Sequence, residues 1–123
     1  MIEDLERVLD AVSDQLAAAV RKQTADRDPA HEDFYRWGWA FTELLDRVDD
    51  VAAVLIGQVS RYGDRRVLRD DRGLDPADRL VEMQARLTEL RSALDAARAH
   101  ARAYHSASSH IAVEVDLDTE VEP

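Results

Sequence analysis

The chain lacks cysteine altogether, which excludes disulfide bonds and thiol chemistry. It also lacks a long apolar run, since the longest, residues 51–56, is far shorter than the roughly 20 residues of a membrane-spanning helix. The first residues, Met1 to Asp4, include acids where a secretory signal carries basic side chains. We therefore expect a cytoplasmic protein with no membrane segment.

The chain also has no excess of basic residues. Lys and Arg together number 16 against 26 Asp and Glu, a formal net charge of -10. Such a chain repels the phosphates of nucleic acids and anionic lipid head groups, so neither is a favoured partner. Lys22 is the only lysine, and the resulting arginine and alanine bias suggests a GC-rich bacterial source.

Apolar residues recur at steps of three and four in three segments, which is the spacing that places side chains on one face of a helix. The stripes are Ile2/Leu5/Leu9/Val12/Leu16, Phe34/Trp37/Phe41/Leu44/Val48/Val51/Leu55 and Leu80/Met83/Leu87/Leu90/Leu94/Ala97/Ala101/Tyr104. The pattern predicts an all-α fold, an antiparallel up-down-up three-helix bundle of one domain. The alternative is a long helical hairpin whose N-terminal helix completes the bundle by dimerisation.

Capping signals give the expected boundaries of the helices. The first helix should span residues 2–23, and Asp28-Pro29 and Asp75-Pro76 should begin the second and third. We expect Gly63 to end the second helix in the left-handed conformation, before a charged linker over residues 64–74. The third helix should run to Tyr104, with charged flanks typical of a coiled-coil strand.

The end of the chain changes character at residues 106–109, where the run Ser-Ala-Ser-Ser is expected to break the helix. Beyond it Ile111, Val113, Val115 and Leu117 alternate with polar residues, which is a strand period. We therefore divide the chain into a helical domain, residues 1–106, and an acidic tail, residues 107–123, that is disordered, loosely docked or extended. The acids of the tail are Glu114, Asp116, Asp118, Glu120 and Glu122.

Aromatic and histidine residues should gather at one end of the bundle, because an up-down-up order brings the start of the second helix beside the end of the third. Phe34, Trp37 and Phe41 follow the apolar stripe and are expected in the core. Trp39 lies on the other side of the helix, where an outward indole favours a protein partner. The candidate interaction surface comprises His31, Tyr35, Trp39, His100 and His105.

The histidines His100, His105 and His110 recur every five residues, a spacing that turns them away from one another on a helix. No Glu-x-x-His or His-Glu-x-x-His pair is present. We therefore expect neither a metal site nor a cofactor.

Carboxylate pairs give an enzymatic alternative. The sequences Glu3-x-x-Glu6, Glu43-x-x-Asp46 and Asp49-Asp50 resemble the acidic pairs with which all-α nucleotide pyrophosphohydrolases of the MazG type hold magnesium. That resemblance would imply a metal-dependent hydrolase. The pairs lie off the apolar stripe, however, and a solvated helix face explains them more simply.

A basic cluster surrounds the linker, and it raises the possibility of a DNA-associated regulator. The segment 61–72 carries five arginines against three aspartates, so its charge excess is small. Its members are Arg61, Arg65, Arg66, Arg69 and Arg72.

The sequence as a whole favours a non-enzymatic module for protein interaction or self-association, and we expect a homodimer. No phosphate loop or catalytic triad can be assembled from it.

Overall fold

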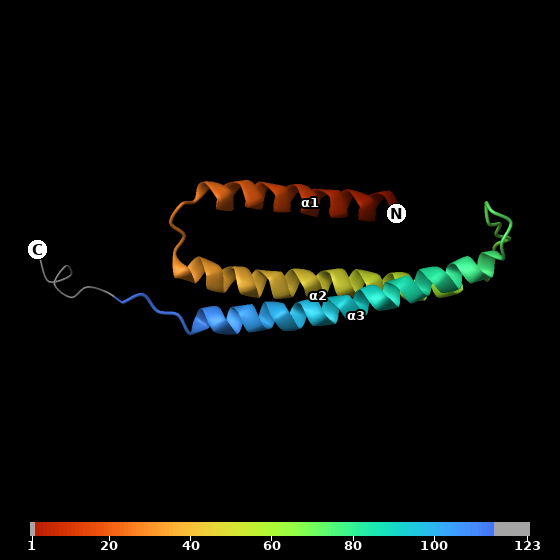
Figure 1. The fold of residues 1–123 in the computed structure, drawn as a ribbon. Helices are drawn as coiled ribbons and strands as arrows, with labels where there is room; N and C mark the ends of the chain where they lie inside the picture. Colours follow the sequence, from red (N-terminus) through yellow and green to blue (C-terminus); the bar gives the residue numbers. More distant parts are fainter. Residues whose placement is uncertain (1, 115–123) are drawn as a thin grey trace, which may run out of the picture. The chain divides into compact units, whose positions relative to one another are not determined.

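The computed structural model describes residues 2–114 and contains three helices, α1 (Ile2–Ala25), α2 (His31–Arg61) and α3 (Pro76–Ser109) (Figure 1). No strand occurs among these residues. The predicted all-α class is therefore confirmed. The helices belong to two units, one made of residues 1–30 and the other beginning at His31. None of the described helices is both long and apolar enough to cross a lipid bilayer.

The first unit is a single amphipathic helix, α1. Leu5, Leu9 and Leu16 lie on the face that the sequence pattern predicts, and Val12 between them is partly covered. The helix ends in a local turn, because the amide of Asp26 bonds the carbonyls of Lys22 and Gln23 and its carboxylate accepts from the amide of Asp28. A connection over residues 26–30 then leads to α2.

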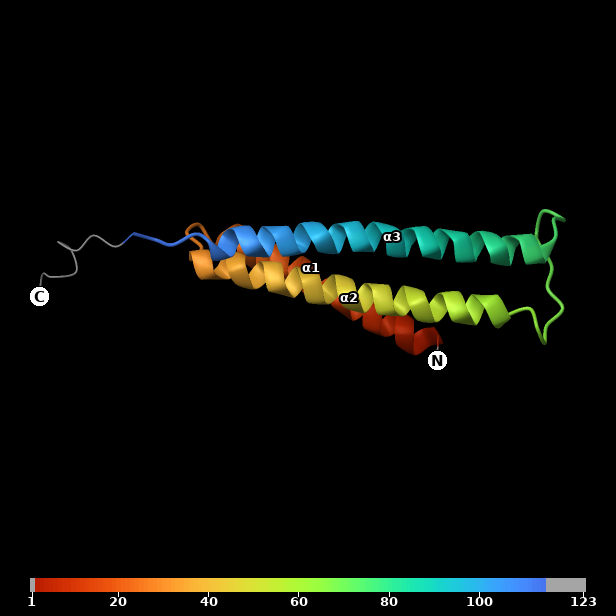
Figure 2. The same ribbon diagram turned by 90° about the horizontal axis from the view of Figure 1, so that it is seen from below.

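The second unit is an antiparallel hairpin of α2 and α3, which lie side by side in both views (Figures 1 and 2). Its most buried residues are spaced by seven or fourteen along each helix, the repeat of a coiled-coil seam. They are Gly38 and Ala52 on α2 and Leu94, Ala101 and Ser108 on α3. Four of these five residues are small, which allows the backbones to approach closely beside them.

The apolar stripes predicted for α2 and α3 are only partly buried, which corrects the expectation that they form the core. Leu94 and Ala101 of the α3 stripe lie in the seam, but neither Gly38 nor Ala52 belongs to the α2 stripe. Six large side chains of the two stripes remain between 38% and 49% exposed. We call these residues the apolar flank: Phe34, Phe41, Val48, Met83, Leu90 and Tyr104. A hairpin has only one internal interface, and it cannot cover this flank by itself.

The predicted helix break at Ser106–Ser109 is wrong, because α3 continues to Ser109. The hydroxyls of Ser108 and Ser109 donate to carbonyls three residues earlier, and Ser108 is 7% exposed against α2. Tertiary packing thus overrides the modest helix propensity of serine. Residues 111–114 form neither helix nor strand, and the rest of the predicted strand period lies outside the described residues.

The turn after α2 also differs from the prediction. The helix ends at Arg61. Two turns follow, in which the amides of Asp64 and Arg66 donate to the carbonyls of Arg61 and Gly63, and Gly63 is not left-handed. The one glycine with positive φ among the described residues is Gly73, at 76°. The left-handed bend therefore lies late in the linker, just before α3.

Candidate interaction surface

Three of the five residues predicted for the interaction surface come together where α2 begins and α3 ends. The ring of His105 lies 4.1 Å from the ring of Tyr35 and 6.0 Å from the ring of Trp39, measured between centroids. The Nδ1 atom of His105 lies 2.9 Å from the Tyr35 carbonyl oxygen. Since a carbonyl only accepts, this bond places a proton on Nδ1. Trp39 is nonetheless 59% exposed.

Gly38 determines how closely the two helices meet here. A Cβ atom at this position would lie 2.8 Å from the Cβ atom and 2.9 Å from the Cα atom of His105. No side chain fits in that space, so α3 rests directly on the backbone of α2. The Trp-Gly-Trp sequence thus has a structural explanation, in which the glycine allows His105 to reach Tyr35 and Trp39.

The other two predicted surface residues do not join this group. His31 lies 3.8 Å from the carboxylate of Glu32, and His100 is exposed on α3. Among the described residues, no hydrogen bond, ion pair or ring contact links either histidine to Tyr35, Trp39 or His105. The spacing of five residues between His100 and His105 explains why they face different directions.

Further along the same side of the hairpin lies an ion cluster that the sequence did not reveal. Arg91 donates to both carboxylate oxygens of Asp49, at 2.8 and 3.3 Å, and Arg98 lies between Asp46, Asp49 and Asp95. The Asp49 and Arg98 side chains are only 13% and 14% exposed. The hydrogen bond from Arg91, with the charges of Arg91 and Arg98, lowers the pKa of Asp49.

We call the side that carries these groups the Trp39 flank, defined by Tyr35, Trp39, Asp46, Asp49, Arg91, Arg98 and His105. Steps of three, four or seven residues place its members on one face of each helix. The flank thus combines an exposed indole with a fixed set of charges. The charged flanks predicted for the third helix are used within the hairpin at Arg91 and Arg98, where they fix its register.

Three of the six carboxylates considered as magnesium ligands pair with arginines. Asp46 and Asp49 bind arginines of α3, and Asp50 lies 3.1 Å from Arg47. Across residues 2–114 no group of three histidine or carboxylate side chains is placed to hold a metal ion.

The linker arginines form no compact basic site. Arg66 stacks over the Tyr62 ring at 4.2 Å, and no ion pair of any of the five arginines is found within the described part of the chain. The linker is held instead by Asp70, which is 4% exposed and accepts from Arg79 at 2.7 Å. That bond, together with the amides of Leu74 and Arg72, lowers the pKa of Asp70.

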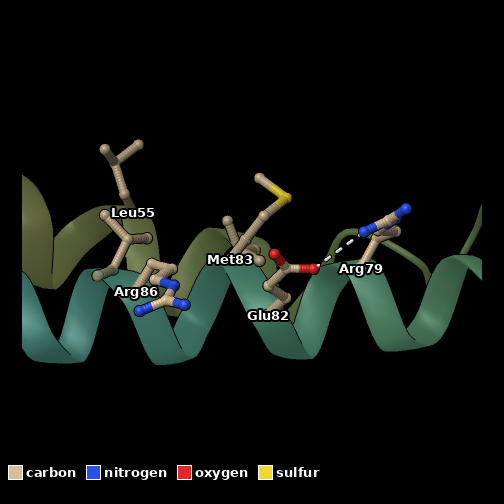
Figure 3. Close-up of a pocket in the computed structure, with 7 residues that line it drawn as sticks. Leu55, Arg79, Glu82, Met83 and Arg86 are labelled. Carbon is tan, nitrogen blue, oxygen red and sulfur yellow. Dashed lines mark hydrogen bonds and ion pairs between the residues drawn. The ribbon is translucent and has the colours of Figure 1, made fainter.

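The apolar flank ends in an open groove of about 560 Å³ near the linker (Figure 3). It lies towards the end of the hairpin where the linker connects α2 to α3 (Figure 2). Apolar side chains line it, and charged side chains of α3 form its rim. The lining residues are Leu55, Val59, Arg79, Glu82, Met83, Arg86 and Leu87.

Comparisons with protein-family models, with curated proteins and with solved structures gave no match to this chain.

Proposed function

We propose that the chain is a non-enzymatic helical module that binds another protein through the Trp39 flank. One observation carries the proposal: Trp39 is 59% exposed although the residues behind it are closely packed. A large aromatic side chain at the surface binds at a low entropic cost when its surroundings are already rigid. The contact of His105 with Tyr35 and Gly38 supplies that rigidity.

The charges beside the indole support the same function. Asp49 and Arg98 neutralise one another across the two helices, so this flank offers a partner an aromatic anchor next to a nearly neutral polar surface. Depletion of unpaired charge around a central aromatic residue is typical of the centre of protein interfaces.

The test compares Trp39→Ala with the wild type for retention of partner proteins from a lysate of the source organism. We expect the substitution to leave helicity unchanged and to weaken partner binding about 30-fold, as truncation of a central aromatic anchor costs about 2 kcal/mol. Val54→Ala is the matched control, because Val54 is also 59% exposed on α2. Equal retention by wild type and Trp39→Ala would refute this role, and unfolding of the variant would show that Trp39 belongs to the core.

A further inference from the structure

The groove near the linker carries a second inference, independent of the Trp39 flank, which lies on the other side of the hairpin. Apolar side chains from both helices line the groove, and Met83, which lies in its α3 wall, is 49% exposed. An apolar surface of this kind, rimmed by charges, is a site for another helix.

The charged side chains of the rim indicate which helix binds in the groove. Arg79, Glu82, Arg86 and Glu89 follow one another at steps of three and four, so they form a single stripe along α3 in which the sign alternates. Among residues 2–114 these side chains pair only with the next member of the stripe, at 3.1 and 3.6 Å, apart from the bond of Arg79 to Asp70. Arg86 and Glu89 are both 75% exposed and available to a partner.

This stripe is complementary to itself in the antiparallel direction. A two-fold axis opposite Gln84 places Glu82 of one copy beside Arg86 of the other, and Arg79 beside Glu89. All four contacts then join opposite charges. A parallel pair in register would instead place each charge beside its own copy, which is repulsive.

We propose that the groove is occupied by a second copy of this chain, and that the two α3 helices pack antiparallel about a two-fold axis level with Gln84, with Met83 of each copy buried close to that axis. Such an interface is isologous and closes at two copies.

Charge reversal tests the register directly. In Glu82→Arg, and likewise in Arg86→Glu, the two inner contacts become like-charged, so we expect the dimer dissociation constant to rise about tenfold. An equimolar mixture of the two variants restores both inner contacts in the heterodimer, which should form with close to wild-type affinity. The measurement is sedimentation equilibrium at low salt, with circular dichroism to check the fold.

Arg47→Glu is the matched control. Arg47 is about as exposed as Arg86, and it too pairs with an acid three residues further along its helix, Asp50 of α2. It should leave the dissociation constant unchanged. A wild type that stays monomeric would overturn the proposal, as would a Glu82→Arg variant that dimerises like the wild type, or a mixture that associates no better than either variant alone. None of these results changes the expectation for Trp39→Ala, so the two proposals fail separately.

Discussion

Gly38 lies where α3 rests on the backbone of α2. Replacing it with alanine has two opposing effects on the free energy of unfolding. Alanine is the better helix former by about 1 kcal/mol, which stabilises the variant. The added Cβ atom would meet His105 at 2.8 Å from its Cβ and 2.9 Å from its Cα. Because a Cα atom cannot move without its helix, α3 must shift, and overpacking of this kind costs about 1 to 3 kcal/mol. The shift also loosens the contact between His105 and Tyr35, so we expect a net loss of about 1 to 2 kcal/mol.

Gly57 provides an internal reference for this prediction. It also lies within α2, but a Cβ atom there would meet only the end of the flexible Arg61 side chain, at 3.6 Å. Gly57→Ala should therefore gain most of the helix propensity, about 0.5 to 1 kcal/mol. Urea unfolding followed by circular dichroism gives both values. A Gly38→Ala variant as stable as Gly57→Ala would refute the close approach of the two helices.

Two further variants test the ion pairs. Asp49→Asn removes the charge that holds Arg91 and Arg98. Because folding lowers the pKa of Asp49 from 3.8, the ionised carboxylate stabilises the fold fully above that pH, and this effect disappears as the pH falls below it. The thermal midpoint of the wild type should therefore exceed that of Asp49→Asn at pH 7, and the difference should shrink below pH 3.8, whereas a constant difference would contradict the assignment. In Asp70→Ala the linker loses its bonds to Arg79, Arg72 and Leu74, so trypsin should cleave at the linker arginines faster while helicity is kept; an unchanged cleavage rate would show that Asp70 does not hold the linker.

The sequence predicted the class of the fold because helix periodicity and capping are local properties. The start of α3 at Asp75-Pro76 is confirmed, since the Asp75 carboxylate accepts from the amide of Ala77. The exposure of Trp39 follows from the same periodicity, because it lies off the apolar stripe. The meeting of Tyr35 with His105 required only the antiparallel order of two helices.

The seam was not predictable from apolar periodicity alone, because it is built largely from small residues. Gly38 and Ala52 carry little apolar surface, so the pattern of large side chains placed the core one step around α2. On α3 the predicted stripe contained the seam residues Leu94 and Ala101 and missed only Ser108. The seven-residue spacing of these small residues was the available signal. The pairing of Asp49 with Arg91 joins residues 42 positions apart, and no local pattern encodes such a contact.

The accessibility of the Trp39 indole tests the proposed function most directly. The chain contains two tryptophans, so Trp37→Phe leaves Trp39 as the only indole. We predict that its fluorescence is quenched by acrylamide nearly as readily as that of free tryptophan, at low and at high protein concentration, since the proposed dimer forms through the opposite flank. An indole that acrylamide cannot reach in the isolated protein would contradict the account, because Trp39 would then already be covered and not available to a partner.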